Sequence, residues 1–336
     1  MLSRLAFRRL PFKSAGLLSR YASTATASTS TISPLQKYKK EADQYEKDGY
    51  AIVRNAIDKD LVQEMSDHVD FISRRYEGIP TQHWHHLIMV NDCFWTRIIT
   101  DNCLLDIAQG VGQSFLSDGN IGMFSTHYFN KLPGPNGIAT LWHADGLYWP
   151  LEPMEVLTLW VAVDRSDREN GCLRVVKGTH IGNHTLKPDL SIKNTLGQST
   201  HTDEEIEREK VVDLELNPGD VSIHHANIVH GSEANKSNRR RCGLTIRYIS
   251  TRTKCTEPTQ PVMLMRGKPV PGINEYHSWP KYRPGYDMPF KGCNEWNAKR
   301  YINPRDEPYY NRTDYNAIEK DIKDGLWKFI DQLGGR

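Results

Sequence analysis

The sequence has 336 residues, of which 38% are apolar and 25% are charged, and its formal net charge at pH 7 is +2. These values are typical of a soluble globular protein with one large domain or two small ones, and they do not point to a basic surface that binds nucleic acids. No run of about eighteen apolar residues occurs, so the sequence predicts no transmembrane segment.

Residues 1–30 have the composition of a mitochondrial transit peptide, because they are rich in serine and threonine and carry basic residues without acidic ones. The basic residues are Arg4, Arg8, Arg9, Lys13 and Arg20. Removing these five from the 43 basic residues leaves 38 against 41 acidic residues, so the mature chain is close to neutral. We therefore expect a matrix location, with residues 35–336 forming the folded domain.

Helical and strand patterns alternate before residue 121. Residues 35–49 and 58–78 have helical character, and the short segment 50–57 between them has strand character. The six cysteines are scattered without a CxxC pair, which excludes a disulfide framework and a cysteine-ligated metal: Cys93, Cys103, Cys172, Cys242, Cys255 and Cys293.

Short β-rich runs separated by turn sequences fill residues 121–251. The runs are MFSTHYFNK, TLWHADGLYW, EVLTLWVAVD, CLRVVKG, VVDLELN, DVSIHHANIVHGS and CGLTIRYIST. This pattern predicts an α+β protein with a mainly β core, either a β-sandwich or a jelly roll, flanked by helices. The extension 252–336 ends in an amphipathic helix from residue 315 and is expected to pack around the core, although a lid or a dimer contact is an alternative.

The tripeptide pattern His-x-Asp occurs three times, and only one copy suits a metal site. His68 and Asp70 fall in a predicted helix, where they are about 200° apart around the axis and cannot hold one ion. His201 and Asp203 flank Thr202, which begins a capping box with Glu205 in a solvated segment.

His143 and Asp145 are the exception, because they fall in a predicted strand, where residues i and i+2 point to the same side. His230, in the segment NIVHGS, is the best candidate for a third ligand. Two histidines and a carboxylate form the facial triad of non-haem Fe(II) oxygenases, which leaves positions open for a cosubstrate and O₂. Zinc, which prefers a tetrahedral site, is the alternative metal.

The order of HYFNK, WHADG, NGCLRVVKGTH, NPGD and HGSEANKSNRRR resembles the phytanoyl-CoA dioxygenase family over residues 45–251. This resemblance implies a double-stranded β-helix (jelly roll, cupin-like) and an oxygenase that uses Fe(II), 2-oxoglutarate and O₂. His143, Asp145 and His230 match the family's metal ligands. Arg241, eleven residues after His230, matches the arginine that binds the C5 carboxylate of 2-oxoglutarate.

Other residues of the expected cosubstrate pocket also follow from this resemblance. Arg240 and Arg247 are alternatives to Arg241, of which Arg247 lies on the same strand face. Further contacts with 2-oxoglutarate are expected at Ser232, Trp160, His127 and Lys131, for each of which a structural role is the alternative. Asn130 precedes Lys131 and shares this ambiguity. The remaining histidines of the β-rich region are expected to be structural: His180, His184, His224 and His225.

The sequence thus predicts a dioxygenase that hydroxylates a small organic metabolite and releases succinate and CO₂. Two alternatives stay open, namely a metal-dependent isomerase, lyase or hydrolase on the same scaffold, and a non-catalytic binding protein. Tyr148, Trp149 and Trp160 favour an apolar or ring-bearing substrate. No cluster of basic residues suits the phosphates of coenzyme A, so a small non-CoA substrate is expected. The sequence leaves the oligomeric state open.

Overall fold

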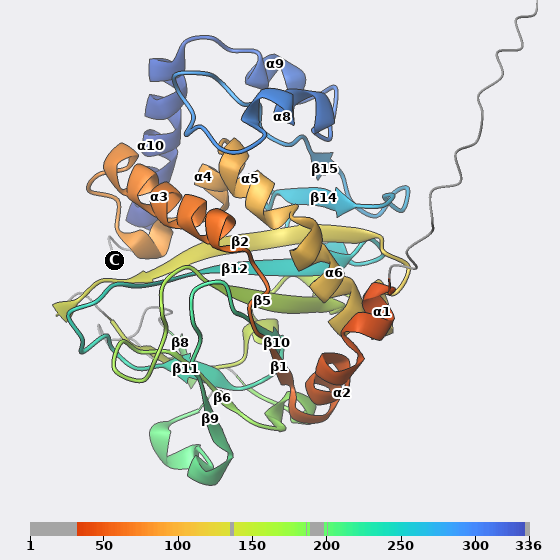
Figure 1. Ribbon diagram of the computed structural model, residues 1–336, viewed down its shortest axis with the longest axis vertical. Helices are drawn as coiled ribbons and strands as arrows, with labels where there is room; N and C mark the ends of the chain where they lie inside the picture. Colours follow the sequence, from red (N-terminus) through yellow and green to blue (C-terminus); the bar gives the residue numbers. More distant parts are fainter. Residues whose placement is uncertain (1–31, 135–137, 186, 189–197, 200, 333–336) are drawn as a thin grey trace, which may run out of the picture. The chain divides into compact units, whose positions relative to one another are not determined.

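The computed structural model describes residues 32–134, 138–185, 187–188, 198–199 and 201–332 (Figure 1). The transit peptide predicted at residues 1–30 lies outside the described residues and stays a prediction. Within the described residues, no helix combines the length and the apolar character needed to cross a membrane.

Two β-sheets carry the fold. The larger sheet has the order β1-β10-β5-β12-β2-β14-β15, and the smaller sheet has the order β3-β11-β6-β9. The strands of the larger sheet are β1 (Tyr50–Val53), β10 (Val221–His225), β5 (Val156–Ala162), β12 (Arg241–Ser250), β2 (Ile121–Lys131), β14 (Val262–Arg266) and β15 (Tyr276–His277). Those of the smaller sheet are β3 (Thr140–His143), β11 (His230–Ser232), β6 (Leu173–Val176) and β9 (Val211–Leu214).

The path of the chain between these sheets is that of a jelly roll. Apart from the short strand β4, which belongs to a separate ribbon, the strands from β2 to β6 alternate between the larger and the smaller sheet, and those from β9 to β12 alternate again. The predicted double-stranded β-helix is therefore confirmed, although no strand pairing joins the two sheets into a closed barrel in the described part of the chain. Two-stranded ribbons complete the β structure: β4 (Leu151–Glu152) with β13 (Lys254–Cys255), and β7 (Lys187–Pro188) with β8 (Gln198–Ser199).

Helices cover the outer face of the larger sheet (Figure 1). They come from the segment between β1 and β2 and from the C-terminal extension. The first group comprises α3 (Lys59–Arg75), α4 (His86–Met89), α5 (Cys93–Ile99), α6 (Asn102–Val111) and α7 (Gln113–Leu116), preceded by α1 (Pro34–Lys37) and α2 (Lys39–Asp48). The second comprises α8 (Cys293–Lys299), α9 (Glu307–Tyr310) and α10 (Tyr315–Gln332).

Helix α3 illustrates how the sequence sets this packing. Asp58 caps its first turn by accepting a hydrogen bond from the backbone N–H of Leu61. A stripe at helical spacing is buried in the main apolar core, and His68 lies in that stripe. The His68 ring lies 3.0 Å from the Tyr128 hydroxyl and 2.9 Å from Asp92, so the first His-x-Asp copy is part of a buried structural network.

The core sheet extends beyond the predicted limits of 121–251. Strand β1 joins one edge beside β10, and β14 of the C-terminal extension joins the other side beside β2. The extension therefore packs as part of the core, as the sequence favoured, and the amphipathic helix predicted from residue 315 is α10. The capping box predicted for Thr202 and Glu205 is also present, at the start of a short 3₁₀ turn.

Candidate metal and cosubstrate site

Two strands of the smaller sheet and one turn bring the candidate metal ligands together. His143 on β3 and His230 on β11 are register partners, and their ring centroids lie 4.1 Å apart. Asp145 Oδ1 lies 3.5 Å from His143 Nε2 and 4.0 Å from His230 Nε2. One ligand atom from each of the three residues lies within 4.8 Å of the others, as metal binding requires.

The backbone around Asp145 differs from the prediction. Strand β3 ends at His143, and Asp145 begins a 3₁₀ turn, so the predicted strand through residue 149 is wrong. Ala144 between them keeps extended dihedral angles (φ −119°, ψ 120°), and this one residue preserves the relation of i to i+2. The two side chains therefore still face the same side.

Backbone carbonyls orient both imidazoles. His143 Nδ1 donates to the carbonyl oxygen of Leu141 at 2.8 Å, and His230 Nδ1 donates to that of Ile228 at 3.0 Å. Each bond leaves the lone pair of Nε2 directed toward Asp145, the arrangement that metal-ligating histidines commonly have. The donor set therefore fits a divalent metal ion.

The electrostatics of the site favour the protonation states that ligate a metal. Burial alone raises the pKa of Asp145, but Arg247, His143 and His230 together outweigh it and lower that pKa far below its usual value. Burial, followed by His143, lowers the pKa of His230 well below its usual value. An ionised carboxylate and a neutral imidazole can bind a metal without first losing protons.

His224 is a further imidazole at this site, although its place in the sequence predicted a structural role. Its Nε2 lies 3.9 Å from Asp145 Oδ2, and burial lowers its pKa to about 4. Its neighbour His225 points to the opposite side of β10 and contacts Tyr45 and His180. Alternation along β10 already implied that only one of the pair faces inward.

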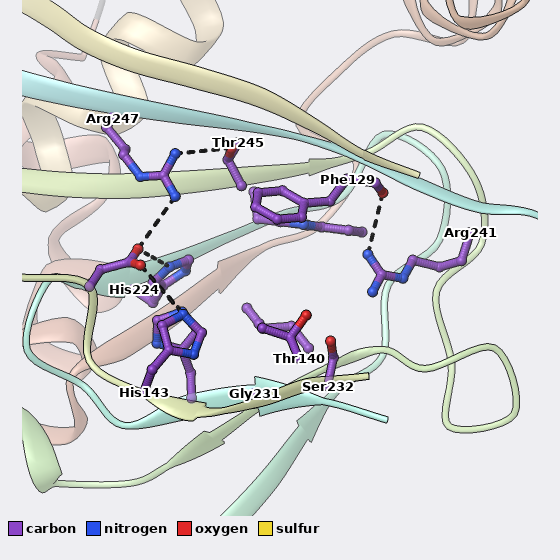
Figure 2. A pocket seen from close by; sticks show the side chains of 13 residues that line it. Phe129, Thr140, His143, His224, Gly231, Ser232, Arg241, Thr245 and Arg247 are labelled. Carbon is purple, nitrogen blue, oxygen red and sulfur yellow. Dashed lines mark hydrogen bonds and ion pairs between the residues drawn. The ribbon is translucent and has the colours of Figure 1, made fainter. Parts of the chain in front are cut away.

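The pocket lies between the two sheets and encloses about 530 Å³, including the part open to solvent. Figure 2 shows Arg247 beside His143 and His224 at one end, whereas Arg241 lies at the other end beyond Phe129. Both arginines come from β12, on which Arg241, Gly243, Thr245 and Arg247 alternate onto the inner face. Thr140, Leu173 and Gly231 complete the opposite wall.

Arg241 is a buried cation without a carboxylate partner among the described residues. It donates to the carbonyl oxygen of Gly171 at 2.9 Å, and its guanidinium carbon lies 5.4 Å from the ring centre of Trp160. Burial lowers its pKa to about 10, so it remains charged at neutral pH. A buried, unpaired guanidinium at the end of a pocket suits a carboxylate ligand.

The neighbouring Arg240, considered as an alternative anchor, faces away from the pocket. It pairs with Asp164 at 2.8 Å and with Asp70 at 2.9 Å. These carboxylates raise its pKa, so its charge is already compensated. Of the two arginines, only Arg241 can meet a ligand inside the pocket.

The remaining predicted contacts divide into two groups. Trp160 and Ser232 line the pocket. Lys131 lies outside the pocket lining and donates to Ser232 Oγ at 2.7 Å, while His127 contacts Arg247 at 3.3 Å from the side of β2. The histidines expected to be structural, other than His224, lie outside the pocket lining.

The sequence model of the family described as "Phytanoyl-CoA dioxygenase (PhyH)" matches residues 45–243. The chain belongs to the phytanoyl-CoA dioxygenase family. Members of this family are 2-oxoglutarate-dependent oxygenases, and the predicted cofactors, Fe(II), 2-oxoglutarate and O₂, agree with the triad found here.

Similar proteins support this assignment. The human "Phytanoyl-CoA dioxygenase, peroxisomal" is 31% identical over 137 residues, which cover 39% of this chain and 40% of that protein. The non-heme monooxygenase ThoJ in complex with Ni has a TM-score of 0.55 at 21% identity, and the match covers 71% of this chain and 89% of ThoJ. The epimerase SnoN, solved with Fe³⁺ and alpha-ketoglutarate, has a TM-score of 0.54 at 20% identity, and the match covers 66% of this chain and 86% of SnoN. The chain matches less than half the length of the first curated relatives, and the solved structures establish the fold alone.

Proposed function

We propose that this protein is an Fe(II)- and 2-oxoglutarate-dependent dioxygenase that hydroxylates a small organic metabolite and releases succinate and CO₂. The observation that carries the proposal is the pairing of two features in one pocket. The first is the triad of His143, Asp145 and His230, and the second is Arg241 at the opposite end, a buried cation for which the described residues offer no counter-ion.

Each group in the pocket has a distinct task in this proposal. The triad would hold the metal, and Arg241 would bind the C5 carboxylate of 2-oxoglutarate with Ser232 and Trp160 beside it. Phe129 and Leu173 exclude water from the space between these ends. When bound, Fe(II) and 2-oxoglutarate would activate O₂, the oxidant that converts a C–H bond of the substrate into C–OH.

The main rival is a zinc-dependent hydrolase, lyase or isomerase that uses the same triad. Such an enzyme has no need for Arg241, which would then be a buried charge retained at a cost to stability. The epimerase SnoN has the same fold and was solved with alpha-ketoglutarate, so the reaction that follows cosubstrate binding must be measured directly.

The proposal is tested by incubating the purified protein with 2-oxoglutarate and O₂, with Fe(II) or Zn²⁺. We expect succinate to form when Fe(II) is added but not when Zn²⁺ is added. It should form slowly without the prime substrate and faster with a substrate identified by metabolite comparison. The product should be heavier than that substrate by one oxygen atom. Tight Zn²⁺ binding without succinate formation under any condition would favour the rival. A product of unchanged mass would instead indicate epimerisation.

We also propose that residues 1–30 direct the protein to mitochondria, on the basis of their five basic and no acidic residues. The human relative is named peroxisomal, so this location does not follow from the family. A fluorescent reporter fused to residues 1–30 should enter mitochondria. A reporter that stays in the cytosol would contradict the proposal.

A further inference from the structure

Arg247 occupies the metal end of the pocket. It follows Arg241 by six residues on β12, which corresponds to roughly 20 Å of extended strand. Across the larger sheet it is in register with Thr158 on β5 and Ser125 on β2, and Thr158 is in turn opposite His224 on β10. Figure 2 shows the guanidinium at the end of the pocket where His143 and His224 lie, and one of its terminal nitrogens lies 3.5 Å from Asp145 Oδ2.

The guanidinium of Arg247 has unused hydrogen-bonding capacity although the residue is only 7% exposed. One terminal nitrogen makes long contacts of 3.3 to 3.4 Å with Ser125, His127 and Thr245. The other lies 3.5 Å from Asp145 Oδ2, and Nε has no partner. A guanidinium has five N–H donors, so this set leaves room for a further acceptor.

Asp145 does not account for the whole charge of Arg247 once the metal is bound. In the proposed complex Fe(II) balances the doubly negative 2-oxoglutarate. Among the described residues that line the pocket, Asp145 is then the only carboxylate to offset two arginines. Lys131 lies outside the pocket lining, and its ammonium group is directed to Ser232 and to the carbonyl oxygen of Glu233. One positive charge at the metal end therefore remains without a counter-ion.

The position of Arg247 at the metal end of the pocket does not suit a second contact with the C5 carboxylate of 2-oxoglutarate. Arg247 contacts a metal ligand, whereas the C5 carboxylate lies a carbon chain away from the end of 2-oxoglutarate that chelates the metal. Arg241 lies at the other end of the same pocket and has no carboxylate partner among the described residues. Trp149 lies over the Arg247 guanidinium at 5.1 Å and offers an apolar surface beside it.

We propose that Arg247 binds a carboxylate of the prime substrate, so that the substrates are small organic acids with an apolar body that packs against Trp149. This inference rests on the proposed function, because the uncompensated charge arises in the complex with Fe(II) and 2-oxoglutarate. The planar fork of arginine recognises a carboxylate through two parallel hydrogen bonds, which positions the remainder of the molecule near the metal.

Matched pairs of neutral and anionic probes test this inference without knowledge of the substrate. Phenylacetate and hexanoate are compared with phenylacetamide and hexanamide, and phenylphosphonate is a third arm. Binding is measured by calorimetry to the protein loaded with Fe(II) and 2-oxoglutarate in the absence of O₂. We expect each carboxylate to bind at least about tenfold more tightly than its amide.

Variants assign the preference to Arg247. Arg247→Gln should bind acid and amide equally, Arg247→Lys should keep part of the preference, and Arg240→Gln, a change outside the pocket, should keep all of it. The inference is overturned if the wild-type protein binds no carboxylate, binds only the phosphonate, or does not distinguish acids from amides. It is also overturned if Arg247→Gln retains the preference while its thermal unfolding remains that of a folded protein.

A separate titration with 2-oxoglutarate keeps this inference apart from the proposed function. If the wild-type protein does not bind 2-oxoglutarate in this titration, the dioxygenase proposal is contradicted. Normal 2-oxoglutarate binding without a preference for carboxylates contradicts only the role of Arg247.

Discussion

His143 and His230 are opposite one another on the antiparallel strands β3 and β11, with ring centroids 4.1 Å apart. Their separation is therefore set by the hydrogen bonding of the smaller sheet, and only Asp145 comes from a turn. A site built on paired strands keeps its geometry better than one built on loops. The two imidazoles should thus be preformed for the metal.

Loss of one imidazole should remove tight metal binding. In His230→Ala only two ligands remain, and we expect the affinity for Fe(II) to fall by more than about 100-fold, beyond the effect of changing residues that merely support ligands. Titration with Fe(II) under anaerobic conditions measures this. His277→Ala, which changes an exposed histidine, is the control and should bind Fe(II) normally. Equal affinities in both variants would exclude His230 as a ligand.

The adjacent residues Arg240 and Arg241 provide a matched pair for cosubstrate binding. Arg241→Gln should weaken 2-oxoglutarate binding by about 10- to 100-fold, because a bidentate, charge-assisted hydrogen-bonded pair with the carboxylate is lost. Arg240→Gln should leave this affinity unchanged, since Arg240 pairs with Asp164 on the other face of β12. The reverse pattern in a binding titration would place the anchor at Arg240.

Gly243 makes room for Trp160, whose ring a Cβ at this position would approach to 2.0 Å. Gly243→Ala should therefore displace Trp160 from the pocket, reduce the free energy of unfolding by about 1–3 kcal/mol and weaken 2-oxoglutarate binding. Gly325→Ala in helix α10 is the control. A Cβ there has no heavy atom within 4 Å apart from the adjacent backbone of its own helix, so the change should stabilise the protein by about 0.5–1 kcal/mol. Chemical denaturation measures both effects. A fully stable Gly243→Ala protein with normal cosubstrate affinity would show that the pocket tolerates this displacement.

The stability of the apoprotein should fall between pH 6.5 and pH 4. Burial, with a contribution from His180, lowers the pKa of His225 to about 4, whereas an unfolded histidine titrates near 6.5. The unfolded chain binds more protons in this window, so the free energy of unfolding decreases as the pH falls through it. Chemical denaturation at pH 7 and pH 5 measures this loss of stability. The difference in the free energy of unfolding between the two pH values should be smaller in His225→Gln than in the wild-type protein, and unchanged in His277→Gln. An unchanged pH dependence in His225→Gln would contradict the assignment.

The sequence was sufficient to choose among the three His-x-Asp copies because periodicity separates helix from strand. His68 lies in α3, as the helical pattern predicted, and the structure adds that it is buried against Tyr128. The strand pattern around His143 predicted the correct facing of Asp145, but it extended the strand too far. A single extended residue, Ala144, was enough to keep the relation that the strand pattern implied.

The sequence could not place residues that depend on pairing between distant strands. His224 faces Asp145 because β10 lies beside β5 in the larger sheet, and nothing near His224 in the sequence specifies that neighbour. The place of β14 between β2 and β15 likewise depends on its pairing with β2, some 140 residues earlier in the chain. Alternation along β10 implied that only one of His224 and His225 faces the pocket, and the order of strands in the sheet decided which one.

The central claim is that one metal ion and one 2-oxoglutarate bind together between the triad and Arg241. The most direct measurement is the visible absorption of the protein on anaerobic addition of Fe(II) followed by 2-oxoglutarate. We predict a new absorption band that saturates at one Fe(II) per chain and that is lost in His230→Ala. An unchanged spectrum, with Fe(II) bound but no 2-oxoglutarate retained, would contradict the account.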